Sequence, residues 1–285
     1  MTDSNSFEPF TFSLGRARIT ALSDGILTAP IGSLYRLGSD QPTPEKFPDA
    51  PAELSVNAFL VETDDKKIMI DAGSGALYGL ALGKVRAALE TLGVSPDDID
   101  DVILTHIHAD HTGGLIADGK AVFKNATLHI GKTEAAFWLT DGAADAPHAT
   151  EKVKGQIARA HDTIDPYEAE NRVELFEDNG DILPGFSATL RAGHTPGHLA
   201  VRFENNGETI VFVGDIVHGN RVQFDNTAVT IDFDHDQPTA ATARAAAFQQ
   251  AADEGYLIAA AHLPFPGVGN ISRNGDQYRF DAYKK

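Results

Sequence analysis

Short apolar runs typical of strands lie in both halves of the chain, with segments of helical spacing between them. The strand-like runs lie at residues 17–22, 57–61, 67–71, 101–105, 126–130, 200–203, 209–213, 256–261 and 277–280. The helical spacings lie at residues 81–92, 132–139, 151–161 and 239–252. Strands gather early and late, and no linker divides residues 1–285. We therefore predict a single domain with two sheets and outer helices.

Turn residues and polar segments set the boundaries between these elements. We expect residues 1–15 to be a polar leader and Ser23-Asp24-Gly25 to end the first strand with turn chemistry. Residues 29–55 are rich in Pro, Gly and Ser, which predicts a long irregular loop forming a rim or lid over an active site. We also expect residues 141–150 to form a polar link and Gly214-Asp215 to end the strand at 209–213.

One segment carries an unusual density of metal-ligand side chains. His106, His108, Asp110 and His111 occupy six positions directly after the buried strand at 101–105. In extended chain, His106 and His108 point the same way, and Asp110 and His111 follow once the chain turns. These two pairs of ligands suit two metal ions better than one. Imidazole with carboxylate and no thiolate favours Zn and leaves Mn, Fe and Co possible.

Further ligand-type residues follow other predicted strands, where sites are commonly built. They are Asp71, His194, Asp215 and His262. We predict two divalent ions, one held by His106, His108 and His194 and the other by Asp110, His111 and His262. Asp215 would bridge them. Asp110 and Asp215, the two carboxylates of this ligand set, are the predicted catalytic residues.

Other polar residues receive supporting or structural roles. We expect Asp71 to orient a ligand histidine through its second ring nitrogen. His198 would be a structural hydrogen-bonding residue near the ions. Four other histidines have no supporting context and are interpreted as structural or surface residues: His129, His148, His161 and His235.

Composition narrows the function and location. The net charge of −18 disfavours nucleic-acid partners because an acidic surface repels phosphates. No apolar run is long enough to span a bilayer, so we expect no membrane partner. The 285 residues include no cysteine, which excludes disulfides and thiolate chemistry. The acidic, polar N-terminus lacks the pattern of a signal peptide, so we expect a cytoplasmic protein.

The motifs at residues 105–114, 193–198 and 214–215, with Asp71 and His262, resemble those of the metallo-β-lactamase superfamily. The resemblance implies an α/β fold, an αββα sandwich of two mixed sheets with helices on the outer faces. Within the superfamily, the chain looks most like the methyl parathion hydrolase family and its lactonase and arylesterase relatives. The sharpest parts are Gly214-Asp215-Ile216-Val217-His218 and His262-Leu263-Pro264-Phe265-Pro266-Gly267.

The resemblance carries site residues onto this sequence. The family's metal ligands match the seven residues assigned above. The family's aromatic substrate pocket implies that Trp138 and Tyr78 line a pocket here. Its leaving-group side implies that the same pocket is lined by His218, Ile231 and Phe233. The chain departs from the family at Asn270, where a histidine is common, and near Gln156, where an aromatic residue is missing.

We expect a hydrolase for a small-molecule ester or lactone, with aromatic lactones and aryl esters as leading substrates. A metal-bridging hydroxide would be the nucleophile. An organophosphate triesterase is the alternative, followed by a glutathione thioesterase of the glyoxalase II type and a redox or binding protein on the same scaffold. The resemblance also implies a homodimer, for which Tyr35 and Phe47 would supply interface contacts if they are exposed.

Overall fold

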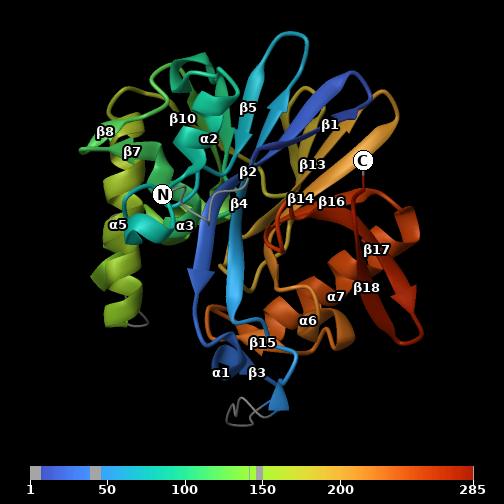
Figure 1. The fold of residues 1–285 in the computed structure, drawn as a ribbon. Coiled ribbons are helices and arrows are strands. Elements are labelled where there is room, and N and C mark those ends of the chain that lie inside the picture. Colours follow the sequence, from blue (N-terminus) through green and yellow to red (C-terminus); the bar gives the residue numbers. More distant parts are fainter. Residues whose placement is uncertain (1–7, 39–45, 141, 146–149, 285) are drawn as a thin grey trace.

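The computed structural model describes residues 8–38, 46–140, 142–145 and 150–284. Within that part, the first half of the chain builds a seven-stranded sheet with the order β1-β2-β4-β5-β6-β9-β10 (Figure 1). Its strands are β1 Phe10–Leu14, β2 Ala17–Thr28, β4 Glu53–Glu62, β5 Lys67–Ile70, β6 Asp101–Ile103, β9 Thr127–Gly131 and β10 Val173–Phe176. The pairs β5–β6, β6–β9 and β9–β10 are parallel and the others antiparallel, so the sheet is mixed.

The second half builds another seven-stranded sheet, with the order β11-β12-β13-β14-β16-β17-β18. Its strands are β11 Gly180–Leu183, β12 Phe186–Leu190, β13 Leu199–Asn205, β14 Glu208–His218, β16 Leu257–His262, β17 Val268–Asn274 and β18 Gln277–Ala282. Only β14 and β16 run parallel. The chain thus completes one sheet before it begins the other.

The two sheets pack face to face through alternate residues of their strands. In β4, Phe59 and Val61 belong to the inner core with Phe203 and Phe212 of the second sheet, whereas Leu60 belongs to the core on the opposite face. This period of two is expected for a strand that is buried on both faces. Both faces of the first sheet are therefore covered, one by the second sheet and one by helices.

Helices cover the outer faces. The longer ones are α2 Val85–Thr91, α4 Lys132–Trp138, α5 Glu151–Glu168 and α7 Gln237–Glu254. Figure 1 shows α2 and α5 beside the first sheet and α7 beside the second. Thr150 and Asp236 cap the N-termini of α5 and α7 by accepting backbone N–H bonds, and Gly255 ends α7 with a φ of 71°. The predicted αββα sandwich is confirmed.

Short elements complete the described residues. They are α1 Ile31–Leu34, β3 Tyr35–Arg36, η2 Gly79–Ala81, η3 Pro96–Asp98, α3 Ala109–Thr112, η4 Gly113–Leu115, β7 Ile116–Ala117, β8 Lys120–Ala121, η5 Ala143–Asp145, α6 Val222–Asp225 and β15 Thr230–Ile231. None of the helices in the described ranges has the length and apolarity needed to cross a bilayer.

Two predicted irregular segments are more ordered than expected. Residues 10–14 of the predicted leader form β1, which pairs with β2 along the sheet edge. Within residues 29–55, α1, β3 and the start of β4 are regular, and residues 39–45 lie outside the described part. β3 pairs with β15, a distant partner that local composition does not reveal.

The predicted turn at Ser23-Asp24-Gly25 is wrong, because β2 continues through it to Thr28 with a shift of register against β4. Asp24 is buried there and accepts hydrogen bonds from the backbone N–H groups of Ser74, Gly83 and Val85. A bulge thus uses residues typical of a turn to fasten the loop that follows β5.

Strand β14 also passes its predicted end and runs to His218. Gly214 pairs with Ala260 of β16, but the register shifts on both sides of it, and its φ is 51°. Asp215 therefore lies within a bent strand rather than after one. Tyr35 and Phe47 are buried against each other, with ring centroids 5.4 Å apart, so they do not have the exposure that the expected interface contacts require.

Candidate metal centre

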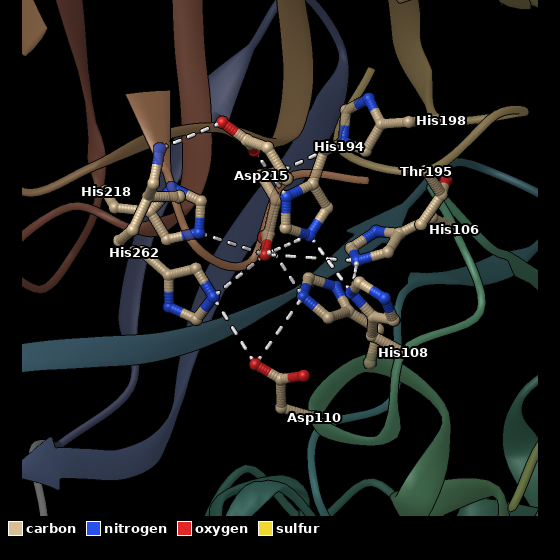
Figure 2. A network of polar contacts seen from close by, with 12 residues as sticks. His106, His108, Asp110, His194, Thr195, His198, Asp215, His218 and His262 are labelled. Atoms are coloured by element: carbon tan, nitrogen blue, oxygen red, sulfur yellow. Dashed lines mark hydrogen bonds and ion pairs between the residues drawn. The ribbon is translucent and has the colours of Figure 1, made fainter. Parts of the chain in front are cut away.

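The seven predicted ligand side chains lie together where loops of both sheets meet. Figure 2 labels all of them except His111. His106 and His108 follow β6, and Asp110 and His111 lie in α3. The second sheet supplies the other three: His194 from the loop between β12 and β13, Asp215 from β14 and His262 from the end of β16. Strand ends and loops of both halves therefore converge on one site.

The first group consists of His106, His108, His194 and Asp215, whose ligand atoms all lie within 4.8 Å of one another. Nδ1 of His108 lies 3.1 Å from Nε2 of His106 and 3.0 Å from Nε2 of His194. Nε2 of His194 lies 3.1 Å from Oδ2 of Asp215. Ligands around a tetrahedral zinc ion are about 3.3 Å apart, given bonds of roughly 2.0–2.1 Å. The spacing therefore fits a divalent cation.

The second group consists of Asp110, His111, His262 and again Asp215. Nε2 of His111 lies 3.1 Å from Oδ1 of Asp215, and Nε2 of His262 lies 3.2 Å from Oδ2 of Asp215. Nε2 of His262 is also 3.4 Å from Oδ2 of Asp110. Asp215 is the residue common to both groups: Oδ1 faces His111 of the second group, and Oδ2 faces His194 of the first and His262 of the second. This arrangement is the one expected of a bridging carboxylate.

Hydrogen bonds on the far side of three rings fix which nitrogen faces the site. Nδ1 of His111 lies 2.7 Å from Asp71, that of His194 lies 3.0 Å from Asp234, and that of His262 lies 2.9 Å from the carbonyl oxygen of Ser55. An acceptor at Nδ1 holds a proton there and turns Nε2 towards the groups above.

Asp71 holds its position through an uncommon backbone conformation. Its φ is 57°, in the left-handed region, directly after β5. The carboxylate accepts from the backbone N–H of Thr105 at 2.9 Å and from its hydroxyl at 2.8 Å, besides the ring of His111. Asp71 thus joins the end of β6 to α3, which fits its predicted orienting role.

Burial and charge divide the histidines into two classes. Burial lowers the pKa of His106 well below its usual value and that of His108 to about 3, and neighbouring imidazoles add to this. Burial also opposes charge on His194 and His262, but Asp215 and other carboxylates raise their pKa values to about 9 and about 10. Burial disfavours the charged form of Asp215, yet the surrounding histidines hold its pKa well below the usual range.

Two buried ligand atoms, one on a ring and one on a carboxylate, support a cation site. Nε2 of His111 and Oδ1 of Asp215 face each other at 3.1 Å, but neither atom forms a hydrogen bond of acceptable geometry within the described residues. Buried polar atoms without partners cost about 1–3 kcal/mol each, so native structures rarely keep them. A cation bound by both atoms would remove this cost. Nitrogen and oxygen donors without sulfur are compatible with zinc and other divalent first-row metals.

His198 lies behind the first group. Its Nε2 accepts the backbone N–H of Asp215 at 3.0 Å. A Cβ on Gly214 would lie 2.6 Å from the same nitrogen, so only glycine fits beside this ring. His198 therefore supports the backbone that carries Asp215.

A cavity of about 580 Å³ opens beside both groups. It reaches His108, Asp110, His194, Asp215 and His262. The rest of its wall is largely apolar: Leu27, Ala29, Leu34, Leu54, Tyr78, Leu82, Ile107, Ala109, Thr112, Glu151, Lys152, Gly155, Gln156, Arg159, Ala160 and Phe233. Several wall residues come from within 29–55, so the described part of that segment contributes to a rim, as expected.

The structure brings only some of the predicted pocket residues to the cavity wall. Tyr78 and Phe233 line the cavity, but Trp138, His218 and Ile231 do not. Trp138 is 2% exposed because its indole N–H donates to Glu134, which holds the ring under His108. His218 and Ile231 are fully buried below the surface of the cavity. His218 stacks on His262 with ring centroids 5.0 Å apart.

As far as the structure describes them, the remaining histidines contribute no side chain to the two groups, although the backbone N–H of His235 donates to the carbonyl oxygen of His194 at 3.1 Å. His129 is buried against Asp101, with Nε2 2.8 Å from its carboxylate, and His161 faces Asp165 within α5. His235 packs beside the ring of Phe137. His148 lies outside the described residues.

Three supporting residues were missed by the sequence analysis. Asp234 accepts from His194 and lies 3.6 Å from the buried Arg244, while Glu134 binds loops on both sides of the first group. Glu134 and Trp138 are four residues apart on one helix, a spacing that indicates a contact. No local pattern pairs Asp234 or Arg244 with the site.

Comparison with known proteins places this geometry in a family. Residues 51–262 match the model of the metallo-beta-lactamase superfamily. The crystal structure of hydrolase AbOPH, described as in the beta lactamase superfamily, is 35% identical, with 98% of each chain covered and a TM-score of 0.89. AidC, a dizinc quorum-quenching lactonase, shares the fold at 24% identity, with 98% of each chain covered and a TM-score of 0.86.

Curated relatives match over a shorter span. A probable metallo-hydrolase of Mycobacterium tuberculosis is 29% identical over 57% of this chain and 56% of its own length. An N-acyl homoserine lactonase of Bacillus thuringiensis is 24% identical over 60% of this chain and 66% of its own length. The chain therefore spans just over half the length of the first of these relatives. Because the family model covers most of the chain, this protein belongs to the metallo-β-lactamase superfamily.

Proposed function

We propose that this chain is a dinuclear metal-dependent hydrolase of lactones and aryl esters, with aromatic lactones as preferred substrates. The observation that carries the proposal is the pair of donor groups sharing Asp215 at the base of a largely apolar cavity. Two divalent ions supply Lewis-acid chemistry when bound, since they lower the pKa of water to about 7 and polarise a carbonyl oxygen.

The side chains present the donors that such ions need. The low pKa values of His106 and His108 keep these rings neutral, so that their lone pairs are available near neutral pH. Asp71, Asp234 and the Ser55 carbonyl orient the other three rings. Asp110 and Asp215 provide negative charge, and Asp215 joins the two groups.

The cavity walls select the substrate. Tyr78 and Phe233 place two aromatic rings on a wall that is otherwise built mainly from aliphatic side chains. Such a surface favours flat apolar groups, because aromatic pairs contribute roughly 0.5–1.5 kcal/mol beyond their buried area. The Bacillus thuringiensis relative, named an N-acyl homoserine lactonase, supports lactones as the substrate class.

An organophosphate triesterase of the methyl parathion hydrolase type is the second candidate, because the same donor groups suit a phosphoryl centre. Phe233 disfavours it by narrowing the space for two alkoxy arms. The acidic composition gave no sign of the basic site that a glutathione thioesterase needs, but Lys152 and Arg159 do reach the cavity. That third candidate therefore belongs in the test.

The test is a substrate panel on purified, metal-loaded protein. It contains an aromatic lactone, an N-acyl homoserine lactone, an aryl ester, a paraoxon-type triester and a glutathione thioester. We expect kcat/KM to be highest for the aromatic lactone. A preference for the triester or the thioester would replace the proposal with the corresponding candidate, and turnover of none would refute it. A homodimer and a cytoplasmic location stay predictions, and light scattering tests the first.

A further inference from the structure

Glu134 is a buried carboxylate that receives four hydrogen bonds from three separate segments. It lies in the first turn of α4 and is 1% exposed. The backbone N–H of Ile107 and the indole N–H of Trp138 both donate to Oε1 at 2.7 Å. The Thr195 hydroxyl and the Gly197 N–H donate to Oε2 at 2.7 and 3.0 Å. Both oxygens are thus used twice, and all four partners are donors.

The partners lie next to the first group of metal-ligand residues on both sides. Ile107 stands between His106 and His108 in the loop of the first sheet. Thr195 directly follows His194 in a loop of the second sheet. The carboxylate of Glu134 therefore connects the two loops whose three imidazoles must converge.

The loop that carries Gly197 packs closely against the backbone of Glu134. A Cβ on Gly197 would lie 2.2 Å from the backbone nitrogen of Glu134. The loop after His194 therefore rests directly on the start of α4. A shift of either loop would break hydrogen bonds to Glu134 and change the distances between His108 and His194, now 3.0 Å between ring nitrogens.

We propose that Glu134 is a positioning residue that sets the spacing of His106, His108 and His194 and thereby the cation affinity of the first group. Within the described residues its carboxylate forms no hydrogen bond to the three rings, and it acts through the loop segments on either side of them. The inference goes beyond the proposed function, because it concerns metal binding and holds whichever ester the protein hydrolyses.

A general structural role is the competing explanation, and Asp101 offers a matched control. Asp101 is also buried, at 3% exposure, and binds Nε2 of His129 at 2.8 Å and Nζ of Lys66 at 2.6 Å. It begins β6, whereas the site lies beyond the other end of that strand. Asp101→Asn therefore removes a buried carboxylate without touching the loops around the ions.

The experiment compares Glu134→Gln with Asp101→Asn. Glutamine keeps the shape, but its NH₂ group must face one of the two donor pairs. We expect Glu134→Gln to bind Co²⁺ at the first group about 10-fold or more weakly in competition with a chelator, as outer partners of ligands typically contribute that much. Its Co²⁺ absorption spectrum should also change. Asp101→Asn should keep both properties, even if its Tm falls.

A milder variant keeps the test decisive if Glu134→Gln does not fold. Thr195→Val removes one of the four donors and should weaken Co²⁺ binding in the same direction by a smaller factor. Wild-type affinity and an unchanged spectrum in folded Glu134→Gln or in Thr195→Val would overturn the proposal. Equal loss of affinity in Asp101→Asn would also overturn it, because the effect would then be general destabilisation. Absence of hydrolysis of any ester, with these affinity differences intact, would refute only the proposed function.

Discussion

Nδ1 of His194 lies 3.0 Å from Oδ1 of Asp234, a contact that fixes the orientation of a ring common to the first donor group and the cavity wall. Asp234 itself accepts the backbone N–H of Ile231 and lies 3.6 Å from Nη2 of Arg244, which is buried. A chain of fixed partners therefore stands behind His194.

Asp234→Asn should weaken metal binding and lower kcat/KM by about 10–100-fold, the usual cost of losing such a partner. The amide keeps the size of the side chain but removes the charge that favours the Nδ1 proton. Asp232→Asn is the control, because Asp232 pairs with Arg36 and not with His194. Chelator competition and initial rates provide the measurements, and equal behaviour of the two variants would contradict the assignment.

Metal analysis should return close to two ions per chain, and chelation should abolish activity. Asp215→Ala should lose nearly all turnover, because Asp215 belongs to both donor groups. Elemental analysis and kcat on the same samples check both statements. A fully active protein with one ion, or a nearly unchanged Asp215→Ala variant, would exclude the dinuclear assignment.

Phe233→Leu should narrow the preference for an aromatic lactone over a paraoxon-type triester. The ring lines the cavity, and its centroid lies 5.8 Å from that of His218 below. Leucine leaves more space and removes an aromatic face, so triester turnover should rise relative to lactone turnover. The ratio of the two kcat/KM values in both proteins decides it, and an unchanged ratio would mean that Phe233 does not select.

The metal-free protein should become less stable as the pH rises from about 6.5 to 10. Burial opposes protonation of His194 and His262, but carboxylates raise their pKa values to about 9 and about 10. A histidine with a raised folded pKa stabilises the fold fully below its unfolded value, roughly 6.5, and this contribution disappears as the pH passes the folded pKa. Thermal melts of chelated and metal-loaded protein should diverge across this range. Parallel curves would contradict the prediction.

Arg159 should favour acidic substrates over neutral ones. Arg159 lines the cavity together with Lys152, both on α5, and it forms no ion pair within the described residues. The chain as a whole carries a net charge of −18. For a matched pair of aryl esters with and without a carboxylate, Arg159→Gln should reduce kcat/KM for the acid more than for the neutral ester. Arg86→Gln, a change on α2 that leaves the cavity wall intact, is the control. Equal losses of kcat/KM for the two esters would show that Arg159 does not select for the carboxylate.

Local sequence patterns were sufficient for the core strands and for the ligand cluster, because both are concentrated in short segments. The strand before His106 is apolar, and four ligand-type residues follow within a few positions. The same local patterns gave a wrong prediction for Asp24. Its side chain binds the backbone N–H groups of Ser74, Gly83 and Val85, which lie 50, 59 and 61 residues further along the chain. Partners at such separations leave no signature in spacing.

The cavity shows the same limit. Tyr78 and Phe233 border it, whereas Trp138 is turned beneath the site by its bond to Glu134. An aromatic residue near a motif indicates proximity, but the direction of its side chain depends on hydrogen bonds that only the fold brings together. Asp234 was missed for the same reason, since forty residues separate it from His194.

Both donor groups draw residues from both sheets: His106, His108, Asp110 and His111 come from the first, and His194, Asp215 and His262 from the second. Each bound ion would therefore cross-link the two halves of a chain that contains no cysteine. Separation of the sheets would require every such link to break, so ion release should be coupled to the opening of the sandwich. In this protein the metal centre would also provide the kind of cross-link that disulfides provide in other proteins. The free energy of unfolding would then rise with the concentration of free metal ion.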